Sequence, residues 1–175
     1  MNHSKQAVFL DRDGTLNEDV GYVSLPEDLH IYPFVKEALS LLKSNGYLLI
    51  VVTNQSGIDR GIYDENMLQT IHNKMQSELD NAIDAFYFCP HLPDSGCACR
   101  KPNLGMIEAA RLDYPIDISA SWMIGDKDID VEMGLNAGLK TILVETGYGR
   151  AHAKILKRQA EKVVANVLEA ARYIV

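Results

Sequence analysis

The stretch AVFLDRDGT at residues 7–15 decides the fold of this chain. Its first part, Ala7 to Leu10, is apolar and long enough to form a short strand, and Asp11-Arg12-Asp13-Gly14-Thr15 then ends the run with polar side chains and a glycine. A continuously apolar run of this length is typical of a parallel strand that helices cover on both faces. The stretch therefore predicts the first strand of such a sheet, with charged groups at its carboxyl end.

The rest of the chain repeats this alternation of apolar runs with segments of helical period. It predicts an α/β fold with a central parallel sheet flanked by helices. Pro33 is expected at the first position of the first helix, and Gly46 should follow its end. The segment Ala151 to Val175 is expected to form one or two helices with a short strand near Val163. The other expected strands span residues 47–52, 85–88, 121–124 and 141–144, and the expected helices span residues 33–44, 65–81, 105–112 and 130–137.

The length and net charge of the chain limit the classes of protein to which it can belong. A chain of 175 residues with 47% hydrophobic residues can bury a core without disulfides, and we expect one domain over residues 1–175. A formal charge of −7 disfavours nucleic acid and anionic membrane surfaces as partners. The start of the chain lacks the apolar core of an export signal, and no apolar stretch approaches the length of a membrane span. We therefore expect a soluble, cytoplasmic protein that acts as a monomer on a small molecule.

Reactive side chains follow the expected strands, at the point where each strand ends. In a doubly wound sheet the carboxyl ends of the strands meet at one crevice, where ligands bind. Residues 11–15, 53–57, 89–101 and 125–130 all fall at this edge. Loops distant in sequence are thus expected to form one site.

The acidic residues at this edge suit a divalent cation. Asp11 and Asp13 are two positions apart in an extended segment, so both can face one reaction centre, and Gly14 permits a sharp turn. Together with Asp126 they form an oxygen-rich, thiolate-free set of the kind Mg²⁺ prefers. A single aspartate at a strand end is as often a solvated or capping residue, but the whole set favours a metal site.

A cluster of cysteines and a histidine lies in the loop after the third expected strand. Cys89, His91, Cys97 and Cys99 follow the pattern C-x-H-x₅-C-x-C, which supplies a complete tetrahedral zinc shell. A disulfide between Cys97 and Cys99 would close a strained ring, and four protein ligands leave no position for a catalytic water. We expect structural Zn²⁺ in the loop 89–99 rather than ordinary thiols. The remaining histidines are isolated and are expected on the surface: His3, His30, His72 and His152.

The motifs at residues 11–15, Thr53, Lys101 and 125–130 resemble, in this order, those of the haloacid dehalogenase (HAD) superfamily of phosphohydrolases, and the resemblance covers residues 7–146. It implies a Rossmann-like HAD fold. It also implies that Asp11 attacks phosphorus to form an aspartyl phosphate and that Asp13 serves as acid and then as base. Its Mg²⁺ ligands would be the carboxylates of Asp11 and Asp126 and the main-chain carbonyl of Asp13, with Asp130 in the second shell. The implied catalytic set is Asp11, Asp13, Thr53, Arg100 and Lys101.

The cysteine and histidine loop narrows the resemblance to a branch that contains the heptose-bisphosphate phosphatases and the histidinol-phosphate phosphatases. Residues 19–23, 53–61 and 100–106 look like the heptose family. That family removes the C7 phosphate of D-glycero-D-manno-heptose 1,7-bisphosphate, in ADP-heptose biosynthesis for lipopolysaccharide core or a surface glycan. The short spacer between His91 and Cys97 keeps histidinol phosphate as the alternative. The implied substrate contacts are Asp19, Val20, Gly21, Tyr22, Thr53, Asn54, Gln55, Ser56, Arg60, Arg100, Lys101 and Lys127.

The intervals between motifs also limit the architecture. Residues 14–53 and 53–89 are already filled by expected helices, strands and loops, so no separate cap domain is expected over the crevice. Two other classes fit less well. A phosphoacceptor receiver domain carries its aspartate after the third strand, where this chain has Cys89. A non-catalytic zinc module would not need the carboxylates, Thr53 and Lys101 together.

Overall fold

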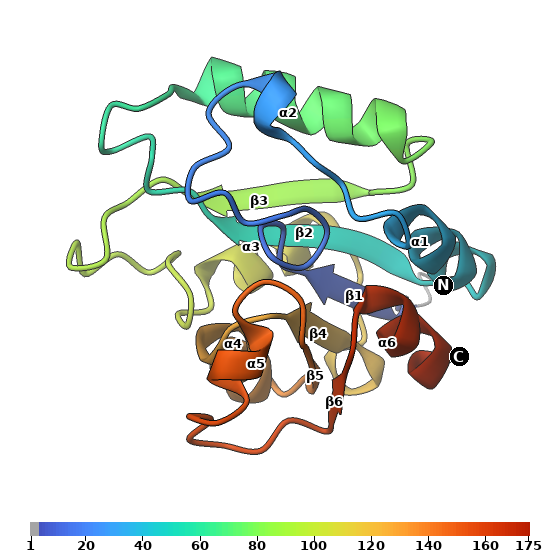
Figure 1. Ribbon diagram of the computed structural model, residues 1–175. Coiled ribbons are helices and arrows are strands. Elements are labelled where there is room, and N and C mark those ends of the chain that lie inside the picture. The colour runs from blue at the N-terminus through green and yellow to red at the C-terminus, as the bar shows by residue number, and fades with distance from the viewer. Residues whose placement is uncertain (1–3) are drawn as a thin grey trace.

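The computed structural model describes residues 4–175 and contains a six-stranded sheet in the order β3-β2-β1-β4-β5-β6 (Figure 1). All five strand pairs are parallel, so every strand ends at the same edge. Leu10 at the end of β1 pairs with Val51 of β2 and with Ile124 of β4. The strand order therefore reverses at β1, and a crevice forms there. The strands are β1 Ala7–Leu10, β2 Leu48–Asn54, β3 Ala85–Cys89, β4 Trp122–Gly125, β5 Lys140–Val144 and β6 Lys162–Val164.

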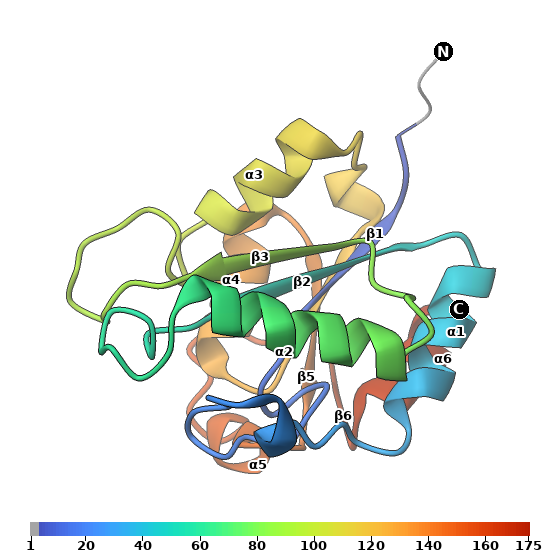
Figure 2. The ribbon, with the colours of Figure 1, turned by 90° about the horizontal axis from the view of Figure 1, so that it is seen from above.

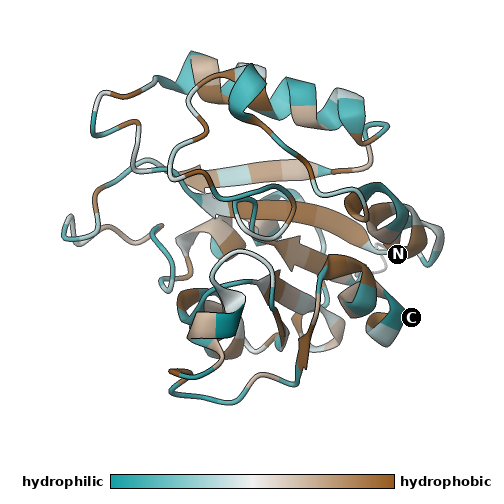
Figure 3. Cartoon of the chain, in the orientation of Figure 1, coloured by the Kyte–Doolittle hydropathy of each residue, from teal (hydrophilic) through white to brown (hydrophobic). Residues whose placement is uncertain are grey.

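Helices cover both faces of the sheet (Figure 2). On one face, α1, α2 and α6 pack on Val8, Leu10 and other alternate strand residues. On the opposite face, α3 and α4 pack on the residues between them, such as Phe9 and Ile50. Both faces of the central strands are therefore packed against apolar side chains, and Figure 3 shows that hydrophobic residues follow one another along β1 and β2. The helices are α1 Val35–Ser44, α2 Glu65–Glu78, α3 Gly105–Asp113, α4 Asp128–Ala137, α5 Gly149–His152 and α6 Val167–Ile174, with 3₁₀ turns η1 Pro26–Asp28 and η2 Ile118–Ala120.

Side-chain capping and backbone conformation determine where the helices begin and end. The Asp64 carboxylate accepts a hydrogen bond from Met67 N (2.8 Å) and caps α2. The expected helix over residues 65–81 stops earlier, because Asp80 and Asn81 have φ values of 53° and 56°, in the left-handed region that a right-handed helix cannot include. Pro33, expected at the first helical position, instead precedes the N-cap Phe34, so that prediction was wrong.

The architecture predicted from sequence is confirmed. Each expected strand and helix is present with its ends within three residues of the prediction, and the C-terminal segment contains α5, β6 and α6. Between β1 and β2 the chain forms only η1 and α1, and between β2 and β3 only α2, so within residues 4–175 no cap domain interrupts the fold. In this part of the chain, no helix has both the length and the apolar composition needed to cross a membrane.

The four isolated histidines do not all lie on the surface. His72 is only 3% exposed, which contradicts that expectation, because its ring stacks on Phe86 between α2 and β3. His30 is exposed and His152 is half-buried, while His3 lies outside the described residues.

Truncation of a central strand residue should destabilise the fold. Leu49 on β2 is fully buried, so Leu49→Ala removes apolar contacts and leaves a cavity; we expect a loss of about 2–5 kcal/mol in the free energy of unfolding. Leu112→Ala on α3, where the side chain is 89% exposed, is the control and should change it by less than about 0.5 kcal/mol. Urea titrations measure both, and equal effects would contradict the assigned core.

Candidate active site

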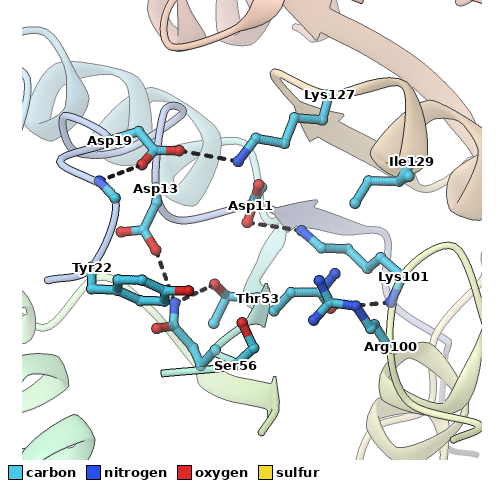
Figure 4. Close-up of a pocket in the computed structure, with 13 residues that line it drawn as sticks. Asp11, Asp13, Asp19, Tyr22, Thr53, Ser56, Arg100, Lys101, Lys127 and Ile129 are labelled. Carbon is cyan, nitrogen blue, oxygen red and sulfur yellow. Dashed lines mark hydrogen bonds and ion pairs between the residues drawn. The ribbon is translucent and has the colours of Figure 1, made fainter. Parts of the chain in front are cut away.

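A pocket of about 220 Å³ lies at the carboxyl edge of the sheet (Figure 4). Its walls come from the loops after β1, β2, β3 and β4, as the strand order requires. The wall is mainly charged and polar, which suits a small anionic ligand better than an apolar one. The lining residues are Asp11, Asp13, Asp19, Gly21, Tyr22, Thr53, Asn54, Gln55, Ser56, Arg100, Lys101, Lys127 and Ile129.

Asp11 lies at the centre of this wall, directly after β1. Its side chain is almost buried, and its Oδ1 lies 2.8 Å from Lys101 Nζ and accepts a hydrogen bond from Arg12 N (2.7 Å). Burial and the nearby Asp130 carboxylate raise the pKa of Asp11 to about 6, against the opposing charge of Lys101. The carboxylate therefore depends on neighbouring cations to remain ionised.

Lys101 supplies a fixed positive charge beside Asp11. Its ammonium group also lies 2.7 Å from Asp130 Oδ1 and donates to the carbonyl oxygen of Val52 (3.1 Å). Its backbone N–H donates to the Asn54 side chain (3.1 Å). Burial alone would lower the pKa of Lys101, but Asp11 and Asp130 outweigh it and raise the pKa. The buried lysine therefore remains charged.

The residues around Asp126 fit a divalent cation. Carboxylate oxygens of Asp11, Asp126 and Asp130 all lie within 4.8 Å of one another. Asp126 is fully buried; its Oδ2 accepts from Tyr148 N (2.9 Å), while its Oδ1 has no hydrogen-bond partner. Burial and repulsion by Asp11 raise the pKa of Asp126 to about 8. A cation at this point would provide the missing partner and relieve the repulsion, and an all-oxygen donor set suits Mg²⁺.

Asp130 is occupied by protein groups. In addition to the Lys101 contact, its Oδ2 accepts a hydrogen bond from Lys127 N at 3.0 Å. Asp130 also lies within reach of the same cation position, and its contacts with Lys101 and Lys127 are those expected of a residue that orients the site. The backbone also approaches the carboxylate of Asp126 closely, because a Cβ on Gly14 or Gly147 would clash with Asp126 Oδ2.

Asp13 lines the same pocket as Asp11, as its spacing predicts. Asn17 Nδ2 donates to its Oδ1 (2.9 Å) and Gln55 Nε2 to its Oδ2 (2.9 Å). Burial would raise the pKa of Asp13, but the adjacent Arg12 guanidinium outweighs it and holds the pKa below its ordinary value. No role was predicted for Arg12 or Asn17 from the sequence. Arg12 lies within the first motif, and Asn17 lies two residues after it.

The pocket is lined by a second lysine, Lys127, in addition to Lys101. Lys127 Nζ lies 3.1 Å from Asp19 Oδ2 and 5.1 Å from the centre of the Tyr148 ring. Asp19 Oδ1 accepts from Gly21 N (2.9 Å), so this ion pair holds the loop after β1 against the start of α4 (Figure 4). Lys127 is half-buried, but Asp11, Asp126 and Asp19 outweigh burial and raise its pKa.

Most of the predicted substrate contacts lie together. Val20 and Arg60 are the exceptions: both are exposed and neither lines the pocket. Spacing alone could not separate them from their neighbours, because it does not show which way a loop side chain points. Ile129 lines the pocket and was not predicted.

The cysteine and histidine cluster lies beside this pocket. Cys99 Sγ is 3.0 Å from Cys89 Sγ, 3.7 Å from Cys97 Sγ and 3.2 Å from His91 Nδ1, and none of the cysteines forms a disulfide. Tetrahedral zinc with Zn–S bonds of about 2.3 Å separates its sulfur ligands by roughly 3.7 Å, so the set fits Zn²⁺. Arg100, which directly follows the cluster, donates to the His91 carbonyl oxygen (3.0 Å).

Two family models match the chain. One, described as HAD-hydrolase-like, matches residues 98–170. The other, described as polynucleotide kinase 3 phosphatase, matches residues 7–131. Both matched ranges include strand ends that form the pocket.

Curated relatives match most of the chain. D-glycero-beta-D-manno-heptose-1,7-bisphosphate 7-phosphatase of Haemophilus ducreyi is 41% identical, over 97% of this chain and 98% of that protein. The protein of the same name from Helicobacter pylori is 45% identical, over 82% and 85%. The crystal structure of D,D-heptose 1.7-bisphosphate phosphatase from B. bronchiseptica, complexed with magnesium and phosphate, is 33% identical and superimposes with a TM-score of 0.91 over 97% of each chain.

The affinity of the site for Mg²⁺ should weaken as the pH decreases. In the metal-free protein the pKa is about 8 for Asp126 and about 6 for Asp11, so protons compete with the cation over this range. We expect the affinity to weaken as the pH falls from 8 to 6, by up to about tenfold per pH unit for each displaced proton. Calorimetric Mg²⁺ titrations would measure this, with Glu161→Gln at an exposed acid outside the pocket as the control. A pH-independent affinity would contradict the assigned ligands.

Proposed function

Because this chain belongs to the HAD-like phosphatases, in the family whose curated members are named D-glycero-D-manno-heptose-1,7-bisphosphate 7-phosphatase, we propose that it hydrolyses the C7 phosphate of that sugar. The activity belongs to ADP-heptose biosynthesis for lipopolysaccharide core or a surface glycan. One observation carries the proposal at the level of chemistry. Asp11 lies at the end of β1 between the Lys101 ammonium and the orphaned Asp126 oxygen, in a pocket of mixed charge.

Asp11 and Asp13 divide the reaction between them. An Asp11 carboxylate oxygen attacks phosphorus, and the bond from phosphorus to the C7 oxygen breaks. Asp13 gives that oxygen its proton in molecules in which its carboxyl group is protonated, and the low pKa of this carboxyl makes it a strong acid for the step. Asp13 then takes a proton from water, which attacks the aspartyl phosphate and releases inorganic phosphate and free Asp11. Lys101 faces Asp11 throughout and stabilises the charge on the transferring group.

The carboxylates of Asp11 and Asp126 and the main-chain carbonyl of Asp13 would hold Mg²⁺. The ion, when bound, neutralises the repulsion between the phosphate and the attacking carboxylate. Asp130 contributes by fixing Lys101 and the backbone of Lys127. The protein therefore holds both the attacking group and its counter-charges in place before the substrate arrives.

The remaining pocket residues bind and orient the sugar bisphosphate. Thr53 and Ser56 at the end of β2 offer hydroxyl groups to the transferring phosphoryl oxygens. Arg100 and Lys127 are the lining cations left for the second phosphate, and this position supports them over the exposed Arg60. The other proposed contacts with the substrate are Asp19, Gly21, Tyr22, Asn54 and Gln55.

We propose structural Zn²⁺ at Cys89, His91, Cys97 and Cys99. This metal would order the loop 89–99 and so aim Arg100 into the pocket. Thiolate ligands persist in a reducing compartment, which supports a cytoplasmic enzyme. The lining residues run from Asp11 to Ile129, which supports a single catalytic domain over residues 1–175, and we propose that it works as a monomer.

A substrate comparison tests the activity. Under Mg²⁺ we expect phosphate release from both anomers of heptose 1,7-bisphosphate to exceed release from fructose bisphosphate, histidinol phosphate and a 3′-phosphorylated oligonucleotide by at least about tenfold in kcat/KM. Asp11→Asn should lower kcat more than about a thousandfold, because it removes the attacking oxygen's charge. Preference for histidinol phosphate, or an active Asp11→Asn, would contradict the proposal.

Loss of a zinc ligand should reduce both metal content and turnover. We expect Cys97→Ser to lose the zinc that the wild-type protein binds and to lower kcat/KM by about 10- to 100-fold, because Arg100 is no longer held. Asp94→Asn, an exposed position in the same loop, is the matched control and should change neither. Elemental analysis and phosphate release measure the two effects. Full zinc content in Cys97→Ser would contradict the ligand set.

A further inference from the structure

A buried arginine lies directly behind the pocket. The Arg12 side chain is fully buried and does not line the pocket, although it lies between Asp11 and Asp13 in sequence. A guanidinium group cannot lose its proton in a protein and is rarely buried without complete pairing. Its partners therefore indicate what it does.

The guanidinium group grips Asp13 with two parallel hydrogen bonds. Nε lies 3.0 Å from Asp13 Oδ1, and Nη2 lies 2.9 Å from Oδ2. A bidentate pair of this kind fixes the plane of the carboxylate as well as its position. Lysine could not replace it, since an ammonium group has no planar fork.

His72 holds the opposite end of the guanidinium group. Its Nε2 lies 3.3 Å from Arg12 Nη1. All nitrogens of arginine are donors, so Nε2 is the acceptor, and His72 must be neutral with its proton on Nδ1. Burial and the adjacent Arg12 charge lower the pKa of His72 to about 3, which agrees with a neutral ring. The ring is fixed in turn by stacking on Phe86, with centroids 4.2 Å apart and planes at 17°.

Neutral groups complete the set around Asp13. Asn17 donates to Oδ1 and Gln55 donates to Oδ2, and the Tyr63 hydroxyl donates to the amide oxygen of Gln55. The Gln55 amide is thereby held in one orientation. The Asp13 carboxylate accepts four hydrogen bonds and is held in one orientation while it faces the pocket.

We propose that Arg12 and His72 are positioning residues for the reaction: His72 fixes the Arg12 guanidinium, and Arg12 fixes the Asp13 carboxylate at the distance and angle that proton transfer needs. The inference rests on the role proposed above for Asp13. Neither residue touches the pocket, so substrate and Mg²⁺ binding should not depend on them. A small displacement of an acid–base group is sufficient to slow turnover by about a hundredfold.

Substitutions at His72 test this arrangement. His72→Leu removes the acceptor, and we expect kcat to fall about tenfold while KM and Mg²⁺ affinity change less than twofold. His72→Gln offers an amide oxygen in its place and should recover kcat to within about threefold of wild type. Arg12→Lys keeps the charge but loses the fork, and kcat should fall about a hundredfold.

Met75→Ala is the matched control. Met75 is also buried on α2, one turn after His72, so the substitution lowers the melting temperature without touching Arg12. We expect its kcat to be unchanged. If Met75→Ala slows turnover as much as His72→Leu, or if His72→Gln is no better than His72→Leu, the proposal is overturned.

Two further measurements keep the inference separate from the proposed function. Nitrogen NMR of the wild-type protein at pH 7 should show His72 neutral and protonated on Nδ1; a cationic ring or a proton on Nε2 overturns the proposal even if the variants do not fold. Asp13→Asn tests the underlying role. Full activity in that variant refutes the role of Asp13, whereas an inactive Asp13→Asn with a fully active His72→Leu refutes only the positioning.

Discussion

The site depends on the confinement of several carboxylates in a space that water barely reaches. Asp11, Asp126 and Asp130 are almost or completely buried, with carboxylate oxygens within 4.8 Å of one another, and Lys101 forms ion pairs with Asp11 and Asp130. Burial and mutual repulsion raise the pKa values of Asp11 and Asp126. Such an arrangement has a high electrostatic cost unless cations offset it. Lys101 supplies part of this offset, and a divalent ion bound beside these carboxylates would supply the rest. A phosphate group would then meet a site that is ready to accept negative charge.

The topology of the sheet makes this confinement possible. β1 lies between β2 and β4, so the loops after these strands converge, although those after β1 and β4 are more than a hundred residues apart in sequence. Gly14 and Gly147 let two backbone segments approach the Asp126 carboxylate where a Cβ would clash. The Thr146 hydroxyl donates to the Gly14 carbonyl oxygen (2.7 Å) and ties the loop after β5 to the first motif. Rigid strands and short loops thus hold the charged groups, as a preorganised site requires.

The cysteine and histidine loop and the pocket are parts of one structure. Cys89 is both a member of the proposed zinc set and the last residue of β3, so the cluster is anchored in the sheet. Arg100 and Lys101 directly follow Cys99. Arg100 donates to the His91 carbonyl oxygen within the same loop, and the backbone N–H of Lys101 donates to the Asn54 side chain at the end of β2. The position of Lys101, for which we propose a catalytic role, therefore depends on the order of the loop before it.

The sequence by itself determined the parallel sheet, the strand ends that carry Asp11, Thr53 and Asp126, and the cysteine and histidine set, because each is a local pattern of hydrophobicity or spacing. Only the tertiary structure decided which side chains face inward. It excluded Val20 and Arg60 from the pocket and buried His72 against Phe86, since these outcomes depend on how loops and helices pack across the sheet. The same packing placed Arg12 behind Asp13, a relation that spacing could suggest but only contacts between distant elements could establish.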